Sequence, residues 1–95
     1  MASITGHLFA ITGAASGIGR ATAELLAKGG ALLSLSDMDG EAVQRFAKSM
    51  TDNGVPVISK AVDVRNREEV ETWIAETVEH YGRPLDGKWT TIGRI

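Results

Sequence analysis

The sequence contains no cysteine, which excludes disulfide bonds and thiolate metal sites. Its two histidines, His7 and His80, lie far apart and neither has a second ligand at metal spacing. No apolar run approaches the roughly 18 residues that a membrane span needs, and the N-terminus lacks the charged start and long apolar stretch of a secretory signal. We therefore expect a cytoplasmic protein with no metal ion and no membrane contact.

The charge is nearly balanced, at −2 from 10 basic and 12 acidic side chains. The basic residues are scattered, and the densest acidic patch is Glu68, Glu69 and Glu71. Because nucleic-acid surfaces need clustered Lys and Arg, we expect no nucleic-acid partner. A content of 43% hydrophobic and 23% charged residues is typical of a globular chain, and 95 residues make one small domain or part of a larger one.

Apolar patterning predicts three strands that alternate with three helices. Short apolar runs at 8–11, 31–35 and 55–62 predict buried strands, and helical spacing follows each of them. Asp39 is the expected N-cap of the second helix, and Asn66 with Glu69 forms a capping pair at the start of the third. The predicted buried stripes are Ile18, Ala21, Thr22, Leu25 and Leu26; Val43, Phe46, Ala47 and Met50; and Val70, Trp73, Ile74, Thr77, Val78 and Tyr81.

This alternation requires a parallel sheet with right-handed crossovers. We predict an α/β fold, a Rossmann-like half (βαβαβα) with a three-stranded parallel sheet that is truncated before the fourth strand. The first strand should lie in the middle, the second beside it and the third outside that. Residues 88–95 show little periodicity, so we expect a disordered tail there. The first strand would then form an open edge, which invites pairing with another chain.

A glycine-rich turn, TGAASGIG at 12–19, joins the first predicted strand to the first predicted helix. The start of a helix offers unpaired backbone N–H groups and a partial positive charge, both of which favour anions. Gly13 would allow the sharp turn, Gly17 the approach of a phosphate, and Gly19 the contact of helix with sheet. The Ser16 hydroxyl could contact the same anion or simply belong to the turn. The segment therefore predicts a pyrophosphate site.

The complete pattern T-G-x-x-x-G-I-G, placed between strand and helix, resembles the cofactor turn of short-chain dehydrogenases/reductases (SDRs). The resemblance continues to about Gly87. It implies that residues 1–87 form the N-terminal NAD(P)-binding Rossmann portion of an oxidoreductase that transfers hydride between a nicotinamide cofactor and an alcohol or ketone. The cofactor-binding residues that it implies are Gly13, Ser16, Gly17, Ile18, Gly19, Asp37, Met38, Asp63 and Val64.

Two acidic residues at later strand ends fit the same resemblance. Asp37 can accept hydrogen bonds from the adenosine ribose and would repel a 2′-phosphate. A basic residue just before the second glycine accompanies NADP use in the family, and Ser16 stands there, so NAD is the expected cofactor. Asp63 with Val64 occupies the family's adenine-contacting position. Without the resemblance, Asp37 could equally be a residue that begins a turn. Asp63 could equally belong to the segment that leads into the third helix.

The family's downstream catalytic Ser and its Tyr-x-x-x-Lys pair do not occur in this sequence. The single tyrosine is Tyr81, and position 85 is Leu85 rather than lysine, so we assign no catalytic residue. We expect cofactor binding without catalysis by this chain alone. Because the ending KWTTIGRI does not match the family pattern, we expect a truncated or misread gene product.

Two alternatives stay open at this point. One is a non-catalytic partner chain that pairs, with itself or with a full-length relative, through its exposed edge strand. The other is a methyltransferase-type nucleotide-binding domain, which also uses a glycine turn and an acidic residue after its second strand.

Overall fold

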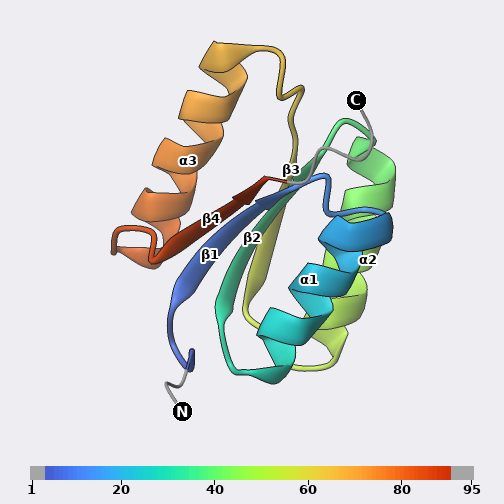
Figure 1. The fold of residues 1–95 in the computed structure, drawn as a ribbon, viewed down its shortest axis with the longest axis vertical. Coiled ribbons are helices and arrows are strands. Elements are labelled where there is room, and N and C mark those ends of the chain that lie inside the picture. The colour runs from blue at the N-terminus through green and yellow to red at the C-terminus, as the bar shows by residue number, and fades with distance from the viewer. Residues whose placement is uncertain (1–3, 91–95) are drawn as a thin grey trace.

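A computed structural model describes residues 4–90 (Figure 1). The four strands form one parallel sheet in the order β3-β2-β1-β4, with α1 and α2 on one face and α3 on the other (Figure 1). The predicted half-fold, with the first strand central and the third outermost, is confirmed. The elements are β1 (Leu8–Thr12), α1 (Gly17–Lys28), β2 (Leu32–Asp37), α2 (Gly40–Asp52), β3 (Val57–Ala61), α3 (Arg67–Tyr81) and β4 (Gly87–Thr90).

The sheet extends one strand beyond the three expected from the sequence. β4 pairs in parallel with β1, from Phe9 opposite Gly87 to Thr12 opposite Thr90. This corrects the expectation of an open edge at the first strand, since β1 has a neighbour on both sides. Residues 88–90, expected to lie in a disordered tail, belong to this strand, and the rest of that expected tail, 91–95, lies outside the described residues.

Two hydrogen bonds between Asp86, just before β4, and Leu8 of β1 fix the point at which these strands join. Its backbone N–H donates to the Leu8 carbonyl at 2.9 Å, and its Oδ2 accepts from the Leu8 N–H at 2.8 Å. Arg83 adds a hydrogen bond from Nη1 to the Gly6 carbonyl at 2.8 Å and places Nη2 3.3 Å from the Asp86 carboxylate. The register of β4 is therefore set by the residues that precede it, and not by its own apolar pattern.

The two faces of the sheet carry side chains of different size. Toward α1 and α2 the strands present large residues that form one core with the predicted stripe of α2, which is confirmed as buried. Toward α3 they present Ala10 and Ser34, and this leaves room for Trp73, which is only 1% exposed. The large core residues are Phe9, Ile11, Leu33, Leu35, Val43, Phe46 and Met50.

A closed ring of hydrogen bonds ties α3 to β2. Trp73 Nε1–H donates to Ser34 Oγ at 2.8 Å, and Thr77 Oγ1 donates to the Trp73 carbonyl at 2.8 Å. The single hydroxyl proton of Thr77 is used in that bond, so Ser34 must be the donor in the 2.6 Å contact between the two hydroxyls. Each buried hydroxyl thus both donates and accepts, which removes the cost of burying it.

The first helix turns a different face to the sheet from the one that its periodicity predicts. Its buried residues are Gly19, Ala23 and Leu26. Leu26, from the predicted stripe, is buried as expected, whereas Ile18 and Leu25 of the same stripe are 73% and 69% exposed. Gly19 lets α1 lie close to the turn before it, and this close contact outweighs the burial of the larger side chains.

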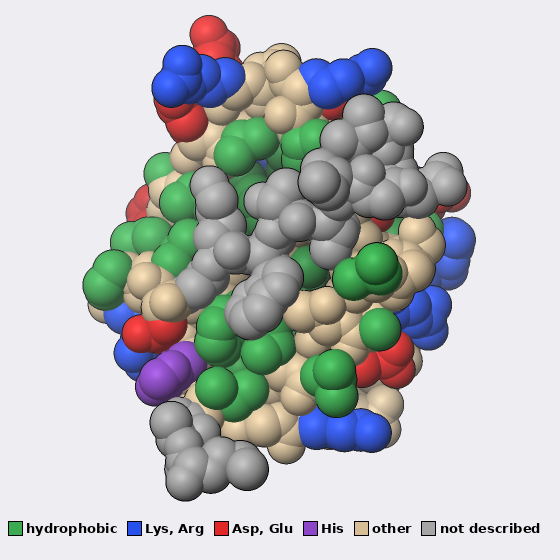
Figure 2. Space-filling model, in the orientation of Figure 1, with side chains coloured by type: hydrophobic (Ala, Val, Ile, Leu, Met, Phe, Trp, Pro, Cys, Tyr) green, Lys and Arg blue, Asp and Glu red, His purple; other side chains and the backbone are tan. Residues whose placement is uncertain are grey.

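Charged side chains lie at the rim of the face in Figure 2, with basic and acidic ones interspersed around hydrophobic ones in the middle. Several form exposed ion pairs within or between elements, which contribute little stability individually. Within residues 4–90, no helix has the length and hydropathy needed to cross a membrane. The ion pairs include Arg20 with Glu24, Lys48 with Asp52, Lys60 with Glu76, and Arg67 with Glu71.

Candidate functional site

The glycine turn lies at the carboxyl edge of the sheet, between β1 and α1. Gly13 and Gly17 have φ values of +64° and +58°, which favour glycine. A Cβ on Gly19 would lie 2.1 Å from the Gly13 carbonyl oxygen, so only glycine allows this contact between helix and turn. A Cβ on Gly17 would meet nothing within 4 Å. Gly19 therefore serves internal packing, whereas Gly17 borders open space.

The N-terminus of α1 carries no side-chain cap. Ser16 occupies the N-cap position with an extended backbone but makes no capping hydrogen bond, and the first turn holds no acidic residue. The other two helices are capped as predicted, since Asp39 accepts from the Ala42 N–H and Asn66 from the Glu69 N–H. The first amides of α1, with the positive end of the helix dipole, thus remain uncapped beside the open space at Gly17. This arrangement suits an anion.

Asp37, the last residue of β2, bonds directly to the glycine turn. Its Oδ2 accepts from the Ala15 N–H and its Oδ1 from the Asp39 N–H, both at 3.0 Å. A second bond, from the Ala14 N–H to the Ser36 carbonyl at 3.0 Å, holds the turn against the same strand. A carboxylate has about four acceptor positions. Asp37 can therefore accept two further hydrogen bonds, one on each oxygen.

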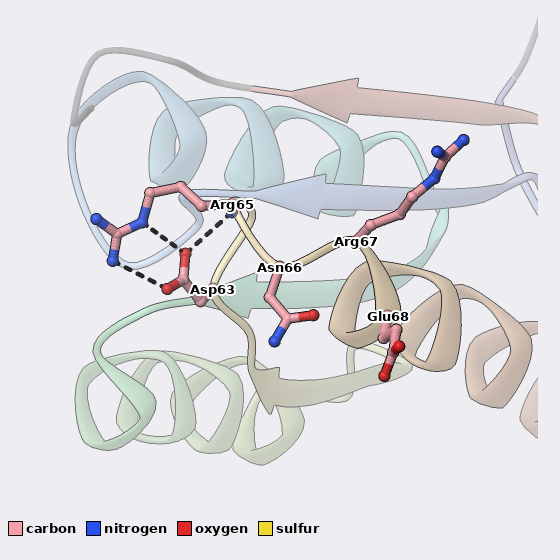
Figure 3. A pocket seen from close by; sticks show the side chains of 5 residues that line it. All are labelled: Asp63, Arg65, Asn66, Arg67 and Glu68. Carbon is pink, nitrogen blue, oxygen red and sulfur yellow. Dashed lines mark hydrogen bonds and ion pairs between the residues drawn. The ribbon is translucent and has the colours of Figure 1, made fainter.

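Asp63 lies just beyond β3, and the neighbouring Val62 N–H donates to the Asp37 carbonyl at 3.0 Å. Its Oδ1 accepts from the Arg65 backbone N–H at 2.9 Å and from Arg65 Nε at 3.0 Å, and its Oδ2 accepts from Arg65 Nη2 at 2.9 Å (Figure 3). The side-chain hydrogen bonds from Arg65, followed by the backbone one, lower the pKa of Asp63. The side-chain hydrogen bonds to Asp63, together with its negative charge, raise the pKa of Arg65. Asp63 is thus an ionised acceptor.

A shallow hollow opens beside this ion pair (Figure 3). Its floor includes the start of α3, where the predicted capping pair is confirmed: the Glu69 N–H donates to Asn66 Oδ1 at 3.2 Å. The Glu69 carboxylate accepts in turn from Asn66 Nδ2 and from the Asp63 N–H, each at 3.1 Å. The residues that line the hollow are Asp63, Arg65, Asn66, Arg67 and Glu68.

Apolar side chains are exposed along the same edge of the sheet. Ile18 in the first turn of α1, Met38 after β2 and Val64 after Asp63 are 73%, 60% and 42% exposed. Each follows the carboxyl end of one of three successive strands, which is where open α/β sheets bind ligands. They supply apolar surface next to the polar groups of Asp37 and Asp63.

The structure therefore gathers the sequence-predicted site residues along one edge, and the turn and Asp37 touch. Tyr81 lies elsewhere, at the end of α3, where its hydroxyl donates to the Leu33 carbonyl at 2.8 Å. Burial raises the pKa of Tyr81 to about 12. Arg65 also lines the hollow and pairs with Asp63, and no sequence pattern singled it out. Among the described residues, no three His, Asp or Glu side chains are placed to hold a metal.

These features define a Rossmann-type nucleotide-binding half-domain. They are a parallel half-sheet, a glycine turn at the start of an uncapped helix, and a carboxylate at the end of the next strand. Comparison with known proteins narrows this class. The family model for short chain dehydrogenases matches residues 7–87. The chain belongs to the short-chain dehydrogenase family.

Individual relatives agree with this assignment. The chain is 43% identical over 90 residues to the short-chain dehydrogenase/reductase aba4 of Botryotinia fuckeliana, covering 94% of this chain and 34% of that protein. It is 35% identical over 91 residues to levodione reductase of Leifsonia aquatica, with the same coverage of 94% and 34%. The chain thus spans about a third of the length of these curated relatives.

Solved structures give the same result. A short-chain dehydrogenase/reductase from Burkholderia phymatum, crystallised in complex with NAD, superposes with a TM-score of 0.84 at 36% identity, over 88% of this chain and 30% of that one. A short-chain dehydrogenase from Mycobacterium smegmatis superposes with a TM-score of 0.87 at 31% identity, over 94% of this chain and 37% of that one. The family match over residues 7–87 favours the dehydrogenase interpretation over the methyltransferase alternative.

Proposed function

We propose that this chain binds NAD at the carboxyl edge of its sheet. The observation that carries the proposal is the uncapped start of α1, which faces open space at Gly17. The pyrophosphate would bind to the amides of this first turn. The adenosine ribose would bind to the two remaining acceptor positions of Asp37, and the adenine would lie by Asp63, between the exposed Met38 and Val64. Gly13, Ser16 and Ile18 complete the proposed site.

The same residues favour NAD over NADP. Two adjacent ribose hydroxyls match the two acceptor positions on Asp37, whereas a 2′-phosphate would bring negative charge against the carboxylate. Ser16, in the exposed N-cap position, offers a hydroxyl but no positive charge to offset that repulsion. We therefore propose NAD as the cofactor.

When bound, NAD supplies the hydride chemistry of the family, which acts between the nicotinamide and an alcohol or ketone. The residues of this chain bind and orient the adenosine half. We assign Tyr81 no part in proton transfer, because a proton-transfer group works best with a pKa near the operating pH. The pKa of Tyr81, at about 12, lies far above that, and its proton is held by Leu33. We propose that the chain alone binds the cofactor without turnover.

Pairing with another chain through a sheet edge is a weaker proposal. It depends on an open edge at β1, and β4 occupies that edge. A partner strand would have to join one of the two outer strands, β3 or β4, instead.

Removing the Asp37 carboxylate tests the proposed ribose contact. We expect Asp37→Ala to weaken NAD binding by about 10- to 100-fold, since hydrogen bonds to a charged group contribute roughly 1.5–3 kcal/mol. The preference for NAD over NADP should shrink, because the repulsion of a 2′-phosphate disappears with the carboxylate. The measurements are calorimetric titration with both dinucleotides and the rise in melting temperature at saturating NAD.

Asp52→Ala is the matched control, because this carboxylate lies exposed at the far end of α2 and pairs with Lys48 on the same helix. Asp37→Asn is a second variant that keeps an amide oxygen for the Ala15 N–H, so that loss of the turn contact is not mistaken for loss of ligand binding. Unchanged NAD affinity in both Asp37 variants would contradict the ribose assignment. A wild-type melting temperature that millimolar NAD does not move would contradict NAD binding as a whole.

A further inference from the structure

The Asp63 carboxylate is unusually constrained for a side chain on the surface. Its main-chain N–H is bound by Glu69 at 3.1 Å, and its carbonyl accepts from the Asn66 N–H at 2.9 Å, so the backbone on both sides of the side chain is fixed. Arg65 then fixes the carboxylate itself with three hydrogen bonds. Two of these fall on Oδ1 and one on Oδ2. Of about four acceptor positions, only one remains, and it is on Oδ2.

We propose that Arg65 is a positioning residue that sets base specificity: it holds Asp63 so that one Oδ2 acceptor position faces the site and selects a purine with an amino group. The proposal rests on the proposed NAD site. An ionised carboxylate can only accept hydrogen bonds. A 6-amino purine presents an N–H donor to it, whereas a 6-oxo purine presents another acceptor, and two facing acceptors leave both unpaired.

The guanidinium group is suited to this task. It is planar and carries five donors in a fixed fork, so Nε and Nη2 can engage the two carboxylate oxygens together. A lysine ammonium supplies the same charge but not the fork. The Arg65 side chain is 73% exposed and that of Asp63 32%, so the pair adds little to folding. Its effect lies in the direction of the free acceptor position.

Arg67 provides a matched control within the same hollow. Its side chain is 91% exposed and pairs with Glu71 at 3.3 Å, one turn further along α3. In Figure 3 it points away from Asp63, whereas Arg65 and Asp63 point toward one another. A change at Arg67 removes the same charge from the hollow without touching the carboxylate.

The experiment compares NAD with its 6-oxo counterpart, nicotinamide hypoxanthine dinucleotide, by calorimetric titration of the 95-residue chain. For the wild type we expect NAD to bind about tenfold more tightly or better, as for a site that loses a hydrogen bond to a charged group. Arg65→Gln should reduce this ratio at least threefold. Arg65→Lys should do nearly the same, because charge alone does not orient the carboxylate. Arg67→Gln should leave the ratio unchanged.

The outcomes separate this inference from the proposed function. If the wild type prefers NAD and Arg65→Gln keeps the full preference, Arg65 does not position Asp63, and the inference fails while NAD binding stands. If Arg65→Lys keeps the full preference while Arg65→Gln loses it, charge and not geometry is responsible, which also overturns the inference. If the wild type binds neither dinucleotide, the proposed function fails and the inference fails with it. Melting temperatures of all variants, expected to stay close to that of the wild type, establish that each is folded.

Discussion

Gly17→Ala is expected to abolish most NAD binding while the chain stays folded. Apart from its own neighbours in the chain and the first turn of the helix, the added methyl group would meet no protein atom within 4 Å, and it would occupy the open space beside the first amides of α1. We expect the affinity for NAD to fall on the order of 100-fold, which corresponds to the loss of one or two charge-assisted hydrogen bonds. The positive φ of Gly17 adds a folding cost of about 1–2 kcal/mol. Calorimetric titration measures the first effect and denaturant unfolding the second.

Two other glycines serve as controls for this variant. Gly54 also has a positive φ, +82°, and a methyl group added there would meet nothing within 4 Å; it lies between α2 and β3, at the other end of the sheet. Gly54→Ala should therefore cost similar stability and leave NAD binding intact. In Gly19→Ala the methyl group would collide with the Gly13 backbone, so folding itself should suffer, by about 3 kcal/mol. Full NAD affinity in Gly17→Ala would contradict the phosphate assignment.

Trp73→Ala is expected to destabilise the chain by about 3–5 kcal/mol, the usual cost of removing a large aromatic side chain from a core. Trp73 is 1% exposed and lies against the face of small residues on β1 and β2. Since a domain of this size has a total stability of about 5–15 kcal/mol, this loss should remove a large share of it. Denaturant unfolding followed by circular dichroism measures the change.

The matched control is Thr72→Ala, one residue away on the exposed side of α3, where we expect a change within about 0.5 kcal/mol. Trp73→Phe separates the two roles of the indole ring, because it keeps most of the volume and loses the N–H that donates to Ser34. A stability of Trp73→Ala equal to that of the control would show that α3 is not held to the sheet in this way.

The parts of the fold that could be predicted are those in which the large side chains are also the apolar ones that the structure buries. In α2 the buried side chains are the large apolar ones, and Asp39 precedes them as a cap, so the stripe and the start of the helix could both be predicted. In α1 the two criteria conflict. Gly19 must face the Gly13 carbonyl, and this turns Ile18 outward although it is the more hydrophobic residue. A periodicity based on hydrophobicity cannot weigh such a steric requirement.

The fourth strand was missed for a related reason. Its short sequence, Gly87–Thr90, has no long apolar run, and its register depends on Asp86 and on its bonds to Leu8, which no local pattern reveals. The role proposed for Arg65 could not be predicted from the sequence, because it depends on the direction of its side chain. The spacing D-x-R at 63–65 is the only sequence signal for that ion pair, and such spacing is also common between unpaired residues.

The glycine turn and the two aspartates were predictable because each lies at a strand end, and parallel strands bring those ends to one edge. The hydrogen-bonding state of each carboxylate could not be predicted, because it depends on the path of the backbone around it. Asp37 keeps two acceptor positions and Asp63 keeps one. This difference is the basis for placing the ribose at Asp37 and a single amino group at Asp63.

An amide-resolved NMR titration of the isotope-labelled chain with NAD tests directly whether the dinucleotide binds at the start of α1. We expect the largest shifts on the backbone amides of residues 15–19, with further shifts at Met38 and Val64. Amides at the C-terminal end of α3, near Tyr81, should not move. Unchanged amides at 15–19 with millimolar NAD, or shifts confined to another surface, would contradict the proposal that a dinucleotide binds at the start of α1.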